Sequence, residues 1–307
     1  MKKKLLKNTE WTVLIVSLLL FVIGLIALFS ATQSTEYSEF KKQVQWFLIS
    51  IPFLVLAYFI DYNIIARFST VIYIIALGLL VGVLFTEPIN GARSWYQFGG
   101  TTIQPSELSK VVVVLFMSFF INKLQIRGRK EINKVWKLMI ALIFMALPIG
   151  LIIIQPDYGT AMAYVFAMLF ILFVSGIDRK YIIIACLLVA IAVPIAYQKL
   201  PQHALKRIEV FLNPESDPRG DGYNIIQSKL AIGAGQLVGM GLFQGNQTQL
   251  GFLYPKTTDF IFSVIGEEFG FIATATILVL YVILVTKIIY IAKTAKDNIG
   301  TYIAIGI

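Results

Sequence analysis

Residues 12–30 read "TVLIVSLLLFVIGLIALFS", and this stretch contains no charged side chain. A helix needs about 20 mostly apolar residues to cross a bilayer, so the run is long enough for one span. Basic residues precede it, as in a cleaved signal peptide, but the apolar part is longer than a typical signal core. We therefore expect a retained first membrane helix.

Comparable apolar runs recur along the chain. They cover residues 44–60, 68–86, 138–154, 158–177, 181–197 and 269–286, and one more, 104–121, contains Glu107 and Lys110. Hydrophobic residues make up 58% of the 307 residues and charged residues only 14%, whereas soluble domains have about 25% charged residues. The sequence predicts an all-α, polytopic transmembrane helical bundle, with residues 1–307 forming a single membrane domain.

The basic residues indicate the orientation of the chain. If the N-terminus is cytoplasmic, the 122–137 segment and its six basic residues lie inside, whereas the short outer loops hold only Lys41, Lys42 and Arg93. This distribution agrees with the positive-inside rule. The basic balance of the chain therefore needs no nucleic-acid partner.

Two outer segments are candidates for function, residues 87–104 and the long, Gly-rich stretch 198–258. A connection of this length is rarely a simple linker, so we expect the chemistry to face outward. The sequence stops at "GTYIAIGI", inside a further apolar run that is too short to span. We expect about eight complete spans, a partial ninth and an incomplete C-terminus.

Single Cys186 and His203 residues exclude two kinds of site. No intramolecular disulfide can form, and a zinc site built from His and Cys ligands is not expected.

Two short motifs place charges near helix ends. In "IQPSELSK" (103–110), Pro105 suits the first helical turn, and Glu107 and Lys110 can pair at i,i+3. Glu107 and Lys110 can form an ion pair that only positions the helix, or they can have a functional role inside the membrane, and both interpretations stay open. In "QPDYGTA" (155–161), Asp157 is either a helix N-cap or a group that faces a polar cavity, and the two roles are compatible.

The two outer segments have structural and functional readings. Arg93 in "GARSWYQFG" lies beside aromatic residues that anchor at interfaces, and its guanidinium also suits a phosphate-bearing lipid. The glycines of 222–260 permit re-entrant turns and are only weak evidence of phosphate binding. In the same segment, the apolar residues near Ile225 predict a short amphipathic helix.

The stretch "TTDFIFSVIGEEFGF" (257–271) carries three acids at the start of an apolar run. If the helix begins at Asp259, that residue is an N-cap, Glu267 lies about 12 Å deeper, and Glu268 points the opposite way. The two glutamates then need buried partners, for which the candidates are Lys110, Lys229 and Arg93.

Taken together, four stretches resemble the SEDS family (shape, elongation, division and sporulation), and within it the RodA branch more than the FtsW branch. They are "GARSW…IQPSELSK", "QPDYGTA", "NPESDPRGDGYNIIQSKLAIGAGQLVGMGLFQGNQTQLGFL" and "TTDFIFSVIGEEFGFI". Their joint occurrence in this order is specific and extends through nearly the whole chain. One departure is Thr257, which stands where the family often has histidine before "TDFIF".

The resemblance implies a ten-span, multi-pass glycosyltransferase of the bacterial plasma membrane that polymerises lipid II into peptidoglycan. Its partner would be a class B penicillin-binding protein. The family's essential aspartate corresponds to Asp259, which would be the general base of an inverting transfer. Family-typical polar positions, assigned here to substrate binding, are Arg93, Glu107, Lys110, Asp157, Lys229, Glu267 and Glu268.

The leaving group of that reaction is a diphosphate, so charge stabilisation is needed. Arg93, Lys110 or Lys229 would supply it, and a divalent cation (Mg²⁺ or Mn²⁺) is a candidate cofactor. No protein metal site is expected. Two alternatives stay open, a lipid II flippase and a non-catalytic scaffold for the penicillin-binding protein. The clustering of polar motifs on the outer side favours the enzyme, and a role in elongation rather than in division or sporulation is an expectation only.

Overall fold

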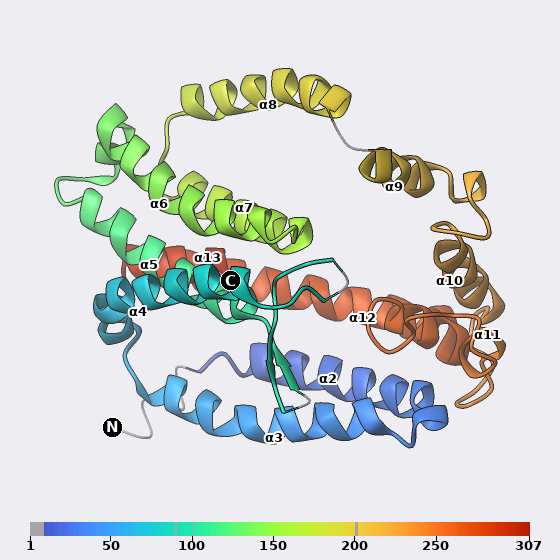
Figure 1. Cartoon of the computed structure of the whole chain (residues 1–307). Coiled ribbons are helices and arrows are strands. Elements are labelled where there is room, and N and C mark those ends of the chain that lie inside the picture. Colours follow the sequence, from blue (N-terminus) through green and yellow to red (C-terminus); the bar gives the residue numbers. More distant parts are fainter. Residues whose placement is uncertain (1–8, 90, 100, 200–201) are drawn as a thin grey trace. The chain divides into compact units, whose positions relative to one another are not determined.

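The computed structural model describes residues 9–89, 91–99, 101–199 and 202–307, and nearly all of its regular structure is helical (Figure 1). The helices are α2 (Trp11–Ala31), α3 (Ser38–Phe59), α4 (Tyr62–Gly82), α5 (Pro105–Leu124), α6 (Val135–Ile154), α7 (Tyr158–Val174), α8 (Arg179–Lys199), α9 (Gln202–Leu212), α10 (Tyr223–Ala234), α11 (Asn246–Gln249), α12 (Ile261–Thr294) and α13 (Asn298–Gly306). Short 3₁₀ turns are η1 (Gln33–Thr35), η2 (Val83–Phe85), η3 (Arg129–Asn133) and η4 (Pro214–Ser216). Strands β1 (Tyr96–Phe98) and β2 (Thr101–Ile103) form an antiparallel hairpin in the first outer segment.

Each apolar run of the sequence overlaps one of these helices, so the all-α polytopic fold is confirmed. In the described part of the chain, five helices are long and apolar enough to cross a membrane. They are α2, α3, α4 (extended through η2), α6 and α12, and α7 is a shorter apolar helix. The number of spans stays a prediction.

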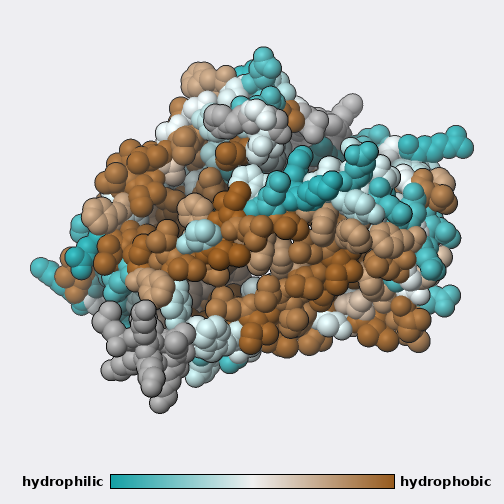
Figure 2. All heavy atoms as spheres, turned by 90° about the horizontal axis from the view of Figure 1, so that it is seen from below, coloured by the Kyte–Doolittle hydropathy of each residue, from teal (hydrophilic) through white to brown (hydrophobic). Residues whose placement is uncertain are grey.

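Large apolar side chains lie on the outside of these helices. Phe53 on α3 is 68% exposed and Phe173 on α7 is 64% exposed, and Figure 2 shows apolar side chains over much of the face that it presents. In water such exposure would be unfavourable, whereas lipid tails are an apolar solvent for it. The exposed surface therefore agrees with a multi-pass membrane protein.

Contacts divide the chain into two compact units. Unit 1 comprises residues 1–54 and 188–287, and unit 2 comprises residues 55–187 and 288–307. The interpretation of the chain as a single membrane domain stays a prediction.

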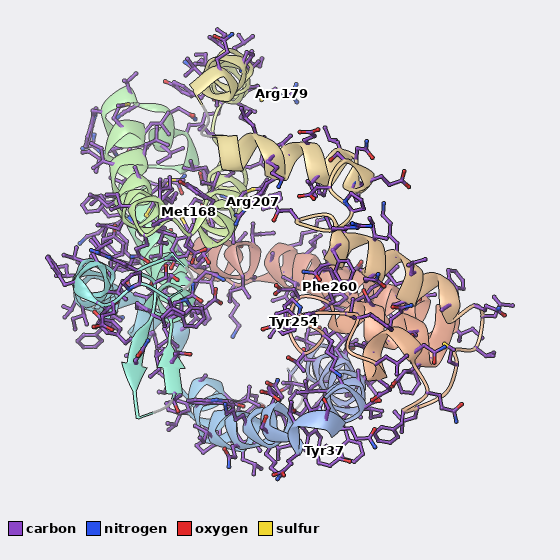
Figure 3. All side chains as sticks on the ribbon, turned by 45° about the vertical axis from the view of Figure 1, so that its right-hand side comes forward. Tyr37, Met168, Arg179, Arg207, Tyr254 and Phe260 are labelled. Carbon is purple, nitrogen blue, oxygen red and sulfur yellow. The ribbon has the colours of Figure 1, made fainter. Side chains whose placement is uncertain are left out.

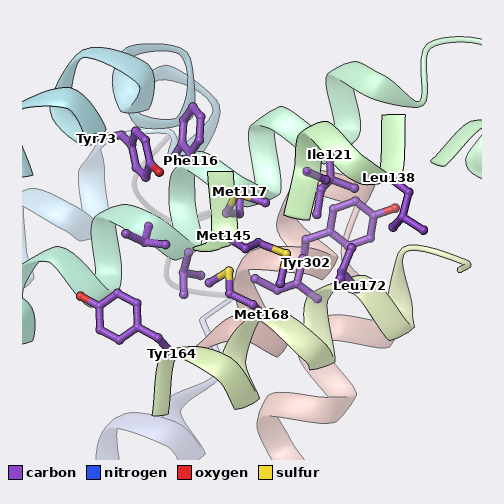
Figure 4. Close-up of a cluster of buried hydrophobic side chains, with 14 of the residues drawn as sticks. Tyr73, Phe116, Met117, Ile121, Leu138, Met145, Tyr164, Met168, Leu172 and Tyr302 are labelled. Carbon is purple, nitrogen blue, oxygen red and sulfur yellow. The ribbon is translucent and has the colours of Figure 1, made fainter. Parts of the chain in front are cut away.

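Unit 2 is built around a buried apolar cluster from α4, α5, α6, α7 and α13 (Figure 4). The rings of Tyr73 and Phe116 stack with centroids 4.0 Å apart. Tyr302 of α13 is fully buried in this cluster, and its hydroxyl donates to Oε1 of Gln125 over 2.7 Å. The short apolar run at the end of the sequence is therefore helical and packs into the core of unit 2.

A charged cluster lies in the basic connection between α5 and α6. Glu131 of η3 accepts hydrogen bonds from Lys134 over 2.6 Å and from Lys137 over 2.5 Å, and Lys137 also donates to the carbonyl oxygen of Leu124. Hydrogen bonds from the two ammonium groups lower the pKa of Glu131 to about 2. This carboxylate thus stays ionised and joins the connection to the start of α6.

Unit 1 includes the 198–258 stretch, which the sequence predicts to be a loop. Much of it is helical, because α9, η4, α10 and α11 all form within it. The predicted short helix near Ile225 is confirmed as α10, and its location in a membrane interface stays a prediction. A second buried cluster joins this stretch to its neighbours, with Leu253 packed beside Ala27 of α2 and Val264 of α12.

Candidate active site

Helix α12 is interrupted at Gly270. The backbone there has φ 74° and ψ −168°, a conformation that is essentially restricted to glycine. Apart from this residue, the helix runs from Ile261 to Thr294. The uncharged span expected at 269–286 thus lies almost entirely beyond the break, and the acidic residues lie before it.

The loop between α10 and α11 replaces the helical hydrogen bonds that are lost at the break in α12. A helix interrupted in this way leaves carbonyl and amide groups without their usual i,i+4 partners. The four bonds are Met240 N to Glu267 O (2.9 Å), Gly241 N to Glu268 O (3.0 Å), Phe271 N to Gln236 O (2.8 Å) and Ile272 N to Leu237 O (3.2 Å). Loop and helix therefore complete each other's backbone pairing.

Glycines of the 222–260 segment allow this close approach. A side chain at Gly235 would overlap the carbonyl oxygen of Gly266, and one at Gly239 would overlap the carbonyl oxygen of Glu268. These two glycines serve backbone packing against α12. Both a re-entrant turn in the membrane and phosphate binding by this segment stay predictions.

Glu267 is completely buried and holds the first turn of α11. Its Oε1 accepts from the amide of Gln247 over 2.6 Å, and its Oε2 accepts from the amide and the hydroxyl of Thr248 over 3.0 and 2.7 Å. Amides at a helix N-terminus lack partners within the helix and favour a negative charge. The expectation that a buried cation pairs with Glu267 is therefore wrong, because α11 takes that place.

Glu268 makes a separate set of contacts. Its Oε1 accepts from Ser30 Oγ over 2.6 Å and from Gln249 Nε2 over 3.0 Å. Its Oε2 is buried without a hydrogen-bond partner among the described residues. Burial lowers the pKa of the Lys256 amino group, and the negative charge of Glu268 opposes that shift. The charge of Glu268 thus acts on Lys256, and Lys229, one of the partners proposed for Glu268, is exposed on α10.

Asp259 lies in a turn that leads into α12. The amide of Phe260 donates to the carbonyl oxygen of Pro255 over 3.3 Å and closes this turn; Figure 3 labels Tyr254 and Phe260 on either side of it. The Asp259 side chain is exposed, and its carboxylate accepts no hydrogen bond from the residues that the structure describes. An unengaged carboxylate at the surface is available to an incoming hydroxyl group.

The structure corrects the expected helix start. Helix α12 begins at Ile261, two residues beyond Asp259, and the carbonyl oxygen of Phe260 accepts from the amide of Val264. The N-cap role expected for Asp259 is therefore wrong. The depth of about 12 Å inferred for Glu267 assumed that start and does not apply.

In unit 2, Asp157 is the N-cap of α7, as predicted. Its Oδ1 accepts from the amide of Thr160 over 3.2 Å, and its Oδ2 accepts from Gln104 Nε2 over 2.6 Å. The carboxylate therefore joins α7 to the residue before α5. A substrate-binding role for it stays a prediction.

Glu107 and Lys110 form the i,i+3 ion pair that the sequence predicts, with 3.1 Å between Nζ and Oε2. Pro105 is the first residue of α5, also as predicted. The side chains of Lys110 and Glu107 are 33% and 55% exposed. An exposed pair of this kind contributes little to stability, so both side chains stay available to a ligand.

Arg93 lies in the first outer segment and is exposed. Its guanidinium donates to the carbonyl oxygen of Leu84 over 3.3 Å. Nearby, the hydroxyl of Tyr96 donates to the carbonyl oxygen of Leu79 over 2.9 Å and anchors strand β1 to α4. The position leaves most of the Arg93 guanidinium donors unused within the described structure, and phosphate binding stays a prediction.

The structure brings together residues that the sequence did not single out. Ser30, Thr248, Gln249 and Lys256 surround the two glutamates of α12. Only Lys256 carries a signal in the sequence, because it is a lone cation three residues before Asp259. The other three are neutral residues whose contacts depend on the fold.

Among the described residues, no group of three or more His, Cys, Asp or Glu side chains is placed to hold a metal ion. A divalent cation (Mg²⁺ or Mn²⁺) as cofactor stays a prediction.

Comparisons with known proteins place the chain among its relatives. The family model of FtsW, RodA and SpoVE, described as cell cycle proteins, matches residues 10–307. Peptidoglycan glycosyltransferase MrdB of Escherichia coli K12 is 34% identical over 316 residues, which cover 98% of this chain and 82% of MrdB. Stage V sporulation protein E of Bacillus subtilis is also 34% identical, over 98% of this chain and 83% of its own length.

Solved structures share the fold. A chain from a structure described as "Structural coordination of polymerization and crosslinking by a peptidoglycan synthase complex" superposes with a TM-score of 0.81 at 24% identity, covering 97% of this chain and 82% of that one. RodA of Thermus thermophilus gives a TM-score of 0.67 at 21% identity, covering 97% and 80%. With a family match along nearly its whole length and relatives that are 34% identical, this chain belongs to the SEDS family of polytopic membrane proteins.

Proposed function

We propose that this protein is a peptidoglycan glycosyltransferase of the bacterial plasma membrane, which polymerises lipid II into glycan strands with Asp259 as general base. The observation that carries the proposal is the exposed Asp259 carboxylate, which no described residue engages, at the entrance to α12. The names of the relatives support the reaction, because MrdB is a peptidoglycan glycosyltransferase.

In this reaction the 4-hydroxyl oxygen of one sugar attacks the anomeric carbon of another. The bond from that carbon to the lipid diphosphate breaks, and the electron pair leaves with the diphosphate. Asp259 takes the hydroxyl proton, and a single displacement inverts the anomeric configuration. The diphosphate leaves already ionised, so one carboxylate suffices and the absence of histidine at Thr257 is tolerated.

Cationic side chains stabilise the diphosphate. Arg93, Lys110 and Lys229 are the candidates, and each is exposed or half-exposed in its unit. Glu107 and Asp157 help to orient the groups around them. The orientation with a cytoplasmic N-terminus places this chemistry on the outer face, as the positive-inside rule favours. Elongation of the wall with a class B penicillin-binding protein is the proposed setting, and a structural relative that belongs to a peptidoglycan synthase complex supports it.

The test is glycan polymerisation by the purified full-length protein with its partner and lipid II. Asp259→Asn keeps the size of the side chain and removes the base, so we expect the rate to fall about a hundredfold or more. Glu215→Gln is the matched control, because it neutralises another exposed carboxylate of the 198–258 stretch, and it should retain the wild-type rate. Wild-type polymerisation by Asp259→Asn would exclude the base assignment.

A lipid II flippase is the second candidate, and the break in α12 is the observation that favours it. Discontinuous helices form the binding sites of many transporters. Translocation of lipid II in vesicles by Asp259→Asn, without polymerisation by the wild type, would favour the flippase. A scaffold would instead leave Asp259→Asn functional in cells.

A further inference from the structure

The turn that presents Asp259 has few anchors of its own. Its closing bond, from the Phe260 amide to the Pro255 carbonyl oxygen, is 3.3 Å long. The Asp259 carboxylate has no partner in the described structure. Whatever fixes the turn therefore fixes the direction of that carboxylate.

Lys256 ties this turn to α11. Its ammonium group donates to the carbonyl oxygen of Thr248 over 2.8 Å. The side chain is half-buried, and burial lowers the pKa of its amino group. A partly desolvated ammonium group needs a partner, so this hydrogen bond restrains the turn more firmly than an exposed one would.

Glu267 in turn fixes α11. This helix has only four residues and cannot hold its own geometry. Three hydrogen bonds from Gln247 and Thr248 to the buried Glu267 carboxylate attach its first turn to α12. Bonds to an ionised group in a buried place are the strong kind.

These contacts close a ring. It runs from the Asp259 turn through Lys256 to Thr248, from there to Glu267, and back along the helical turns of α12 to Ile261. We propose that Glu267 is a positioning residue, which acts through α11 and Lys256 to hold Asp259 toward the substrate. This inference rests on the proposed function, because it assigns Glu267 a task only if Asp259 is the base.

The test measures kcat and KM for lipid II with the full-length protein and its partner. Lys256→Met keeps the aliphatic stem and removes the tether together with a positive charge that interacts with Glu268, so the thermal stability of the variant is measured beside its rates. Glu267→Gln keeps the shape and replaces one acceptor oxygen by a donor that faces the amides of α11. Each single variant should lower kcat about tenfold to a hundredfold, the effect of a misplaced catalytic group, with KM unchanged.

The double variant separates positioning from general loss of stability. Since both residues act in one ring, Lys256→Met combined with Glu267→Gln should be no slower than the slower single variant. Thr274→Val is the control, because it removes the bonds of another buried hydroxyl of α12, to the carbonyl oxygens of Phe271 and Gly270, and changes no contact of α11 or Lys256. Its kcat should equal that of the wild type even where its thermal stability falls.

Three outcomes would overturn the inference. They are wild-type kcat in both single variants, a raised KM at constant kcat, and fold-changes that multiply in the double variant. Asp259→Asn measured alongside keeps the two proposals apart. If it inactivates the enzyme while the ring variants do not, only the positioning role fails; if it leaves the rate unchanged, the base assignment fails first.

Discussion

The side-chain amide of Gln104 donates to Oδ2 of Asp157 over 2.6 Å, while Oδ1 of the same carboxylate caps α7 at the amide of Thr160. Asp157 thus caps its own helix, α7, and also binds Gln104, the residue that precedes α5. A cap and a hydrogen bond to a charged group each stabilise a protein by about 1 kcal/mol or more.

We expect Asp157→Ala to lower the free energy of unfolding in detergent by about 2 kcal/mol, because both contacts are lost. Gln104→Ala removes only the second contact and should cost about half as much. Denaturant titration of the two variants checks this order. Equal losses in both variants would show that the cap contributes nothing.

Glu107→Gln and Lys110→Met test whether the pair on α5 is structural or functional. Exposed ion pairs contribute about 0–1 kcal/mol, so neither change should unfold the protein. If Lys110 meets the diphosphate, Lys110→Met lowers polymerisation strongly and Glu107→Gln lowers it less. Thermal unfolding measured beside polymerisation separates the roles, and full activity of Lys110→Met would restrict the pair to seating α5.

Gly270→Ala should destabilise unit 1. The conformation at Gly270 costs any other residue about 1–3 kcal/mol, and an added Cβ would lie 2.7 Å from the carbonyl carbon of Leu237. Gly24→Ala in α2 is the matched control, because no atom lies within 4 Å of its added Cβ. That control should gain about 0.5–1 kcal/mol from helix propensity. A thermal unfolding midpoint for Gly270→Ala at or above that of the wild type would contradict the assignment of the break.

Acid should weaken the cluster between α5 and α6. The pKa of Glu131 is lowered from 4.5 to about 2, so its stabilising contribution is complete above about pH 4.5 and is lost as the pH falls toward 2. Glu131→Gln lacks this contribution at every pH. The difference in unfolding midpoint between wild type and Glu131→Gln should therefore shrink over this interval, and a constant difference would show that the charge has no part in it.

Local rules predicted several local features correctly. The uncharged runs predicted the helices, and the i,i+3 spacing predicted the pair of Glu107 and Lys110. The N-cap role of Asp157 was predicted from its place just before α7, where it accepts from the amide three residues later. Each of these features depends on neighbours within one helical turn. The sequence contains all the residues that such a feature needs.

Features that depend on distant contacts were missed or misjudged. Ser30 and Glu268 are 238 positions apart, and nothing in either neighbourhood indicates their hydrogen bond. The partner of Glu267 is the backbone of α11, which has no side-chain signature. Asp259 is a local exception, because the Phe260 amide bonds to the Pro255 carbonyl oxygen within the preceding turn and α12 begins only at Ile261. Backbone amides of a loop can satisfy a buried acceptor, and rules based on side-chain type do not predict such contacts.

The break at Gly270 also bears on how the protein is made. Until residues 236–241 are in place, the carbonyl and amide groups on either side of Gly270 lack partners, and such groups are costly within hydrocarbon. The segment 261–294 therefore completes its backbone pairing only after the preceding connection has folded against it. The last long helix of unit 1 thus depends for its final form on residues that precede it in the chain, and it matures only as they fold against it.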